Sequence, residues 1–135
     1  MDKSFKLDIV TPDKKFFGDM AEMIVINTSL GKIGVMKNHI PMVFAVMAGI
    51  IKIRKDGVDR KAFVGEGFME VGRNSVTLMV DAAEWPEDID LRRAQKAKER
   101  AEENLRRELA HKEYMRNKAA LLRAIERIKI TKKSI

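Results

Sequence analysis

The pattern of this chain changes once, within the segment DAAEWPEDIDLRRA from Asp81 to Ala94. Before this segment, short apolar runs alternate with turn residues. After it, the spacing of apolar residues is that of helices up to the C-terminus. Pro86 marks the change, because it lacks the N–H that a sheet needs and favours an extended Trp85. The sequence therefore predicts two domains, a β domain over residues 1–84 and a helical domain over residues 85–135.

The residues just after Pro86 carry the signals of a helix start. Glu87, Asp88 and Asp90 place negative charge where the positive end of a helix dipole would lie. Asp88 is the expected capping residue, since its carboxylate can accept N–H groups of the first turn. An ordinary helix start with no functional role explains this pattern equally well.

The β domain is predicted from short apolar runs separated by turn residues. Several runs alternate polar and apolar residues or are rich in β-branched residues, as strands are. These runs are Phe5–Val10, Phe16–Phe17, Glu22–Thr28, Met42–Val46, Gly49–Arg54, Val58–Val64, Phe68–Val71 and Ser75–Val80. The segment Ser29–Pro41 contains two glycines and a turn-prone Lys37-Asn38 pair. Regularly spaced short strands indicate an all-β sandwich or barrel, and we expect two packed sheets.

The helical domain is predicted to be an antiparallel two-helix hairpin. In the first helix, expected from Asp88 to about Leu109, small and apolar residues recur every three or four positions: Ala94, Ala97, Ala101 and Leu105. A break is expected at Ala110–Lys112, although one long helix also fits the pattern. The second helix is expected from Glu113 to about Ile130, with four apolar anchors: Leu121, Leu122, Ile125 and Ile128. The apolar stripe is thin, so these helices need each other or a partner.

The positive charge of the chain belongs to its helical part. Residues 1–84 carry 12 Lys and Arg against 11 Asp and Glu, whereas residues 85–135 carry 15 against 9, a net charge of +6. Nucleic acid, an anionic membrane surface, or an acidic protein or phosphate ligand would each complement such a surface. The basic part contains only two aromatic residues, Trp85 and Tyr114, which argues against a surface that stacks bases.

The sequence contains no pattern of catalytic or metal-binding residues. There is no cysteine, and His39 is the only histidine among the predicted strands, where a turn or packing role is expected. Gly31 and Gly34 do not form a phosphate loop, because no Lys-Ser pair and no helix follow them. The N-terminus lacks the apolar run of a signal peptide, and no segment is long and apolar enough to span a membrane. We therefore expect no catalytic site, no metal site and no required cofactor.

Several arginines of the helical part recur at helical spacing. Asp90, Arg93 and Arg100 are three and seven residues apart, and Arg123 and Arg127 are one turn apart. In a hairpin, their guanidinium groups would lie close enough to bind phosphate or carboxylate oxygens. A solvated face with ion pairs along each helix explains the same spacing.

The chain as a whole resembles the epsilon subunit of bacterial rotary ATP synthases. The resemblance rests on VTP at Val10–Pro12, GKIGVMKNHIPMV at Gly31–Val43, GFMEV at Gly67–Val71, VTLMVDAAE at Val76–Glu84 and IDLRRA at Ile89–Ala94. It implies a non-catalytic subunit of the central stalk, located at the cytoplasmic face of the bacterial membrane. In this family the β domain binds the gamma subunit and the ring of membrane rotor subunits.

The resemblance also implies particular contact residues and a regulatory role. Gly31, Lys32, His39 and Pro41 are the expected contacts to gamma and the rotor ring, and Lys32 stands where the family often has an acidic residue. The helical hairpin of the family lies folded on the sandwich or extends toward the catalytic alpha and beta subunits. The extended form inhibits ATP hydrolysis.

In some members of the family the folded hairpin binds ATP as a regulatory ligand. The positions that match this pattern are Glu84, Ile89, Asp90, Arg93, Arg100, Arg123 and Arg127. Bound ATP would favour the folded, non-inhibitory state, because a ligand stabilises the state that it binds. A different class of function, a nucleic-acid-binding adaptor that uses the basic hairpin, would show affinity for DNA or RNA that falls steeply with salt. The resemblance implies no nucleic-acid partner.

Overall fold

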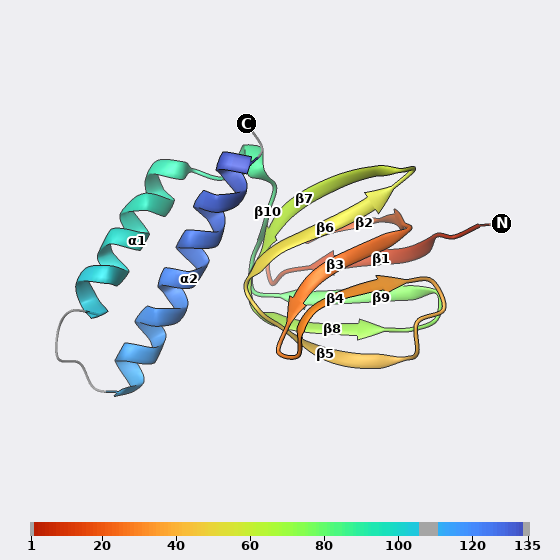
Figure 1. The fold of residues 1–135 in the computed structure, drawn as a ribbon, viewed down its shortest axis with the longest axis horizontal. Coiled ribbons are helices and arrows are strands. Elements are labelled where there is room, and N and C mark those ends of the chain that lie inside the picture. Colours follow the sequence, from red (N-terminus) through yellow and green to blue (C-terminus); the bar gives the residue numbers. More distant parts are fainter. Residues whose placement is uncertain (1, 106–110, 134–135) are drawn as a thin grey trace. The chain divides into compact units, whose positions relative to one another are not determined.

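The computed structural model describes residues 2–105 and 111–133 of the chain, and the side chains of residues 2–105 and 115–132. It divides into two compact units, Met1–Trp85 and Pro86–Ile135. The first unit is built of strands and the second of helices, which confirms the predicted fold class (Figure 1).

In the described part of the chain, the first unit contains ten strands. They are β1 (Phe5–Val10), β2 (Lys15–Ala21), β3 (Met23–Thr28), β4 (Gly31–Met36), β5 (Met42–Val46), β6 (Gly49–Lys55), β7 (Val58–Val64), β8 (Gly67–Val71), β9 (Ser75–Val80) and β10 (Ala83–Glu84). The predicted runs all lie in or overlap these strands. Two strands, β4 and β10, were not predicted.

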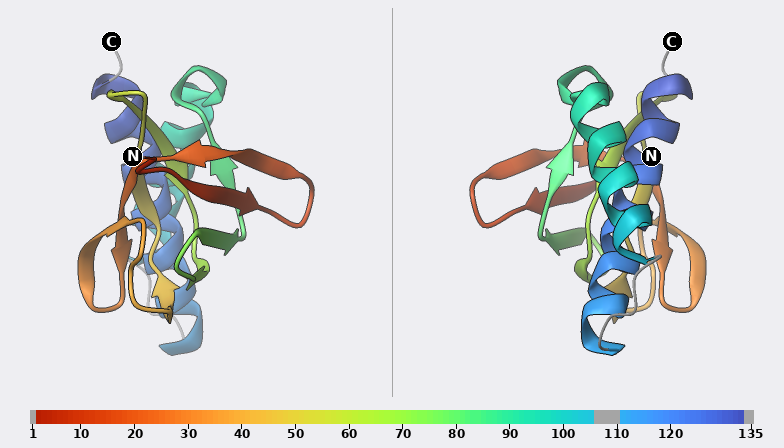
Figure 2. Two further views of the ribbon diagram at one scale, coloured as in Figure 1. Left: turned by 90° about the vertical axis from the view of Figure 1, so that its right-hand side faces the viewer. Right: turned by 90° about the vertical axis from the view of Figure 1, so that its left-hand side faces the viewer.

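The strands pair in the order β10-β7-β6-β3-β5-β8-β9-β1-β2, and β4 pairs with β3 along its whole length. All pairs are antiparallel except β1 with β9. Strands β3 and β5 meet only at Thr28 and Val46, so the order falls into two sheets that join at this point. In Figure 2, the red β1–β2 hairpin and the orange β3–β4 hairpin extend to opposite sides of the unit.

Alternate residues of the strands form one hydrophobic core between the sheets. The burial of β1 and β6 follows the period of two that is expected when one face of a strand points inward. The largest fully buried side chains of this core include Phe5, Leu7, Ile53, Met69 and Leu78. Because the register of each strand is set by this buried face, the outward residues are fixed as well.

The second unit begins with a 3-10 turn, η1 (Pro86–Asp88), followed by the helices α1 (Leu91–Leu105) and α2 (His111–Lys133). The expected helix start at Asp88 is wrong, because this residue belongs to the turn. The expected break at Ala110–Lys112 is wrong for His111 and Lys112, which belong to α2. The remaining residue, Ala110, and the expected end of the first helix near Leu109 lie outside the described residues.

The two helices pack against each other as an antiparallel pair (Figure 1). Ala94 and Ala101 of α1 are buried, as their spacing predicted, but Ala97 is exposed. Each residue turns a helix by 100°, so Ala97 lies about 60° from Ala94 and falls on the edge of the buried stripe. Leu122 of α2 is also exposed, because it lies about 160° around the helix from the buried Ala124.

Candidate functional site

The outer face of β5, β8 and β9 carries a row of exposed apolar side chains. Val43 is 67% exposed, Phe68 58% and Met79 46%, whereas the next residues Phe44, Met69 and Val80 point into the core. Phe68 lies opposite Ala45 on one side and Met79 on the other, so these three residues form one row across three strands. Contiguous exposed apolar surface of this kind marks an interaction site. We call Val43, Ala45, Phe68 and Met79 the apolar row.

Another exposed apolar residue, Leu30, lies at the turn between β3 and β4. Leu30 is 77% exposed at the tip of this turn. The turn is held by Thr28, whose hydroxyl accepts the N–H of Leu30 at 3.2 Å and donates to the carbonyl of Gly31 at 2.8 Å. Gly31 has a φ of 110°, a conformation that glycine adopts without strain. The turn therefore presents Leu30 on a fixed backbone next to the exposed Lys32.

His39 and Pro41 lie in the connection between β4 and β5. The ring of His39 meets the edge of Phe44, with 6.1 Å between centroids, and its Nδ1 lies 2.7 Å from the carbonyl oxygen of Ile40. These contacts fit the predicted packing role of this histidine. A shallow pocket of about 290 Å³ is formed here together with Asn38 and Arg73.

The structure does not bring the four expected rotor-contact residues together. Gly31 and Lys32 lie at the first end of β4, whereas His39 and Pro41 follow its other end. Six residues of strand separate the two ends by roughly 17 Å. The two pairs therefore belong to opposite ends of the β unit.

In the helical unit, the capping residue is Asp90 and the predicted cap at Asp88 is wrong. The Asp90 carboxylate accepts the backbone N–H of Arg93 at 3.0 Å, and its carbonyl accepts the N–H of Ala94 at 3.0 Å. Asp88 lies within η1, one turn too early to reach the free N–H groups of α1. Ile89 is buried, and its N–H closes the turn on the carbonyl of Pro86 at 3.2 Å.

The packing of the two helices brings the arginines to similar heights. The side chain of Asn104 donates to that of Asn117 at 3.3 Å, which sets the register of α1 against α2. At equal numbers of residues from this pair, toward the start of α1 and the end of α2, Arg123 lies level with Lys98 and Arg127 lies level with Ala94. Both heights fall between Arg93 and Arg100, which are exposed on α1. Arg123 and Arg127 are half-buried.

The seventh residue of the expected ATP-binding set, Glu84, belongs to the other unit. It is the last residue of β10 and is paired with Phe63 of β7. The set is thus divided between the β unit, which holds Glu84, and the helical unit, which holds the remaining six residues.

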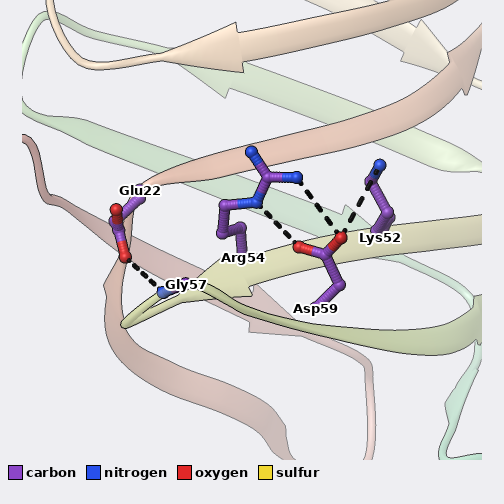
Figure 3. Close-up of polar contacts among 5 residues, drawn as sticks. All are labelled: Glu22, Lys52, Arg54, Gly57 and Asp59. Atoms are coloured by element: carbon purple, nitrogen blue, oxygen red, sulfur yellow. Dashed lines mark hydrogen bonds and ion pairs between the residues drawn. The ribbon is translucent and has the colours of Figure 1, made fainter.

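The β unit also contains a polar cluster near the β6–β7 turn (Figure 3). Nε of Arg54 donates to Oδ1 of Asp59 at 2.8 Å, and a second guanidinium nitrogen donates to Oδ2 at 3.3 Å. The hydrogen bond from Arg54, and then its charge, lower the pKa of Asp59. The carboxylate of Glu22 accepts the N–H of Gly57 at 3.1 Å. These groups bind one another, so we interpret the cluster as a support of the turn.

Within residues 2–105 and 115–132, whose side chains the structure describes, no three His, Asp or Glu side chains are grouped so that they could hold a metal ion. None of the helices in this part of the chain is long and apolar enough to cross a membrane.

Two family models match the chain along most of its length. Residues 4–86 match the ATP synthase delta/epsilon chain β-sandwich domain, and residues 87–132 match the ATP synthase delta/epsilon chain long α-helix domain. The ATP synthase epsilon chain of Caldanaerobacter subterraneus is 49% identical over 98% of this chain and 97% of its own length. The ATP synthase epsilon chain of Caldicellulosiruptor bescii is 45% identical over 96% of this chain and 95% of its own length.

Solved structures show the same fold at low sequence identity. A chain of the Euglena gracilis mitochondrial ATP synthase matches 99% of this chain, and 82% of its own length, with a TM-score of 0.78 and 20% identity. A chain of the central stalk and c-ring of the Tetrahymena thermophila mitochondrial ATP synthase matches 94% of this chain and 96% of its own length. Its TM-score is 0.70 and its identity is 16%. From these matches in sequence and fold, the chain belongs to the ATP synthase delta/epsilon chain family.

Proposed function

We propose that this chain is a non-catalytic subunit of the rotor of a bacterial ATP synthase. Its β unit binds gamma and the ring of membrane subunits, at the cytoplasmic face of the cell membrane, and thereby couples the ion gradient to ATP synthesis. Its helical unit restrains ATP hydrolysis in an extended form that reaches the catalytic alpha and beta subunits. Neither role requires a cofactor.

The observation that carries the proposal is the apolar row. A stable domain that leaves Val43, Phe68 and Met79 in water on one flat sheet face has a surface suited to a permanent partner. Sheet residues on a rigid scaffold are well placed for such a contact, and aromatic side chains contribute strongly to binding energy. We assign gamma to this face. The rotor ring is assigned to the end of the β unit that carries Leu30, Gly31 and Lys32.

The helical unit supports the regulatory part of the proposal through its composition and packing. Few of its described residues are buried, and those in α1 are the small residues Ala94 and Ala101. A hairpin with so little apolar contact has a small difference in free energy between alternative arrangements, as a two-state element needs. Its net positive charge would pair with acidic surfaces of catalytic subunits and guide their contact.

A second proposal, binding of ATP, is supported by the arginines of the same unit. Arg93, Arg100, Arg123 and Arg127 lie within about two helical turns of height, and guanidinium groups suit triphosphate oxygens. We propose that ATP binds these side chains together with Glu84, Ile89 and Asp90, and that it favours the folded hairpin. Calorimetry of the full chain with ATP tests this proposal directly, and Arg93→Ala and Arg123→Ala should abolish the signal.

The rotor proposal is tested by ATP hydrolysis in a rotary ATPase head that lacks its epsilon subunit. The full chain should inhibit hydrolysis, whereas a chain that ends at Trp85 should still bind gamma but not inhibit. Relief of inhibition at high ATP would support the nucleotide switch as well. Full inhibition by the shortened chain would exclude a role of the helices in restraint.

A further inference from the structure

Trp85, the only tryptophan of the chain, is held in a cluster of three side chains from distant parts of the β unit. Its ring stacks on Phe16 of β2, with 4.6 Å between centroids and 29° between planes. Phe17 meets it edge-on at 6.3 Å. The guanidinium carbon of Arg60 of β7 lies 3.7 Å from the ring centroid, a distance typical of a cation–π contact.

The backbone that leads to Trp85 is also bound to β7 and to the connection between β7 and β8. The carbonyl of Ala82 accepts the N–H of Gly65 at 2.8 Å, and the N–H of Asp81 donates to Glu66 at 2.9 Å. Strand β10 then pairs Ala83 and Glu84 with the end of β7. Every residue from Asp81 to Trp85 therefore has a backbone or ring contact within the β unit.

The contacts change at the next residue. Pro86 has no N–H to continue the β10 pairing, and its carbonyl accepts the N–H of Ile89 within the helical unit. The boundary between the two compact units falls at the same peptide bond, between Trp85 and Pro86. A tightly held residue thus stands directly beside the first residue of the other unit.

We infer that Trp85 is an anchor that fixes the pivot of the helical unit at the Trp85–Pro86 bond, and that Phe16 and Arg60 hold it there. The inference rests on the proposed two-state hairpin and names the point about which it moves. While the anchor is held, the two units are joined at the Trp85–Pro86 bond, since Pro86–Asp88 form a turn of the helical unit. When it is released, residues 81–85 join the link and add at most about 17 Å of reach.

The anchor would also set how strongly the folded hairpin is favoured. Doubling the length of a flexible link lowers the effective concentration of the tethered unit by about threefold. Holding Trp85 therefore favours the folded hairpin, and releasing it favours arrangements that need a longer reach. Loosening the cluster should shift this balance without changing any residue of the helices.

The first test uses the fluorescence of Trp85 in the full chain, since it is the only tryptophan. Arg60→Ala and Phe16→Ala remove one wall of the cluster each and keep the reporter. Both should increase quenching by acrylamide and shift the emission to longer wavelength. The matched control is Lys61→Ala, the exposed neighbour of Arg60 on β7, which should behave as the unchanged chain. Equal quenching in all four proteins would overturn the anchor.

Hydrogen exchange gives a second readout that does not depend on the tryptophan. The amide of Gly65 donates to Ala82 and reports release of this backbone, while the amide of Gly72 donates to Ser75 at the β8–β9 turn and serves as the reference. Loss of the cation–π contact should speed exchange at Gly65 about fivefold and leave Gly72 unchanged. Unchanged exchange at Gly65 in the Arg60→Ala chain would count against the anchor even if quenching rises.

These measurements use the isolated chain, so they separate this inference from the proposed rotor role. If Trp85 is held but the chain fails to inhibit hydrolysis, the anchor is supported and the proposed restraint of hydrolysis is contradicted. If the chain inhibits hydrolysis but its Trp85 is freely quenched, the proposed restraint is supported and the anchor is contradicted.

Discussion

The carboxylate of Asp90 accepts the backbone N–H of Arg93 at 3.0 Å, so the first turn of α1 is capped by the residue just before the helix. Both residues belong to the set that we propose for ATP binding. Arg93 therefore extends from a part of the helix that is already fixed. A change at Asp90 would act on this arginine through the backbone.

Replacing Asp90 by Ala should destabilise the helical unit by about 1 kcal/mol, the usual cost of losing an N-cap. The measure is thermal unfolding of the helices followed by circular dichroism at 222 nm. Asp88→Ala is the matched control, because Asp88 lies in the preceding turn and contributes only its charge near the helix start. A larger loss for Asp88→Ala than for Asp90→Ala would contradict the assignment of the cap.

Replacing Gly67 by Ala should destabilise the β unit by roughly 1–3 kcal/mol, because the added carbon would overlap the neighbouring strand. A Cβ at Gly67 would lie 1.9 Å from the carbonyl oxygen of Met79, a backbone atom that cannot turn away. The control is Gly34→Ala in β4, where the nearest atom would be the carbonyl oxygen of Ile24, 3.9 Å away. Urea unfolding of both variants tests the difference, and equal midpoints would refute the predicted overlap.

Replacing Phe68 by Glu should weaken binding to gamma by more than about 2 kcal/mol, if the apolar row is the contact face. The new carboxylate would lose its water in an apolar interface and find no partner there. Val58→Glu is the matched control, since Val58 is also exposed but stands at the start of β7. Calorimetric titration with gamma measures both, and similar losses for the two variants would argue against the apolar row.

The pair Arg54–Asp59 should make a contribution to stability that disappears in acid. The hydrogen bond from Arg54 lowers the pKa of Asp59 in the folded chain. A lowered carboxyl pKa stabilises the fold above the unfolded value of about 3.9, and this gain is lost as the pH falls through the folded pKa. The melting temperatures of the unchanged chain and Asp59→Asn should therefore converge between about pH 5 and pH 2. Both residues are at the surface, so added salt should reduce the difference at neutral pH.

Most of the β unit could be predicted from the sequence, because the residues of β1, β3 and β6 alternate between buried and more exposed positions. Strand β4 was missed because its two glycines resemble turn residues. Gly31 does stand at a turn, with positive φ, but Gly34 lies within the strand and faces Val25. Strand β10 is two residues long and has no periodicity that a sequence pattern could reveal.

The candidate sites were predictable only in part, since spacing along the chain does not give contacts between elements. The heights of Arg123 and Arg127 relative to α1 follow from the Asn104–Asn117 bond, which no helical periodicity indicates. The cluster around Trp85 joins residues of β2 and β7 that lie far apart in the sequence. The apolar row was not predicted, because only the register of β5, β8 and β9 shows that Phe68 lies beside Ala45 and Met79.

The parallel pairing of β1 with β9 has a consequence for how the chain is made. Leu7, in the first strand of the β unit, pairs with Val76 in one of its last strands. The β1–β2 hairpin can form early, but its other edge stays open until β9 has been synthesised, and contacts so distant in sequence slow folding. During this interval the exposed edge of β1 is the part of the nascent chain most open to wrong strand pairing, and chaperone contact at this stage would fall there.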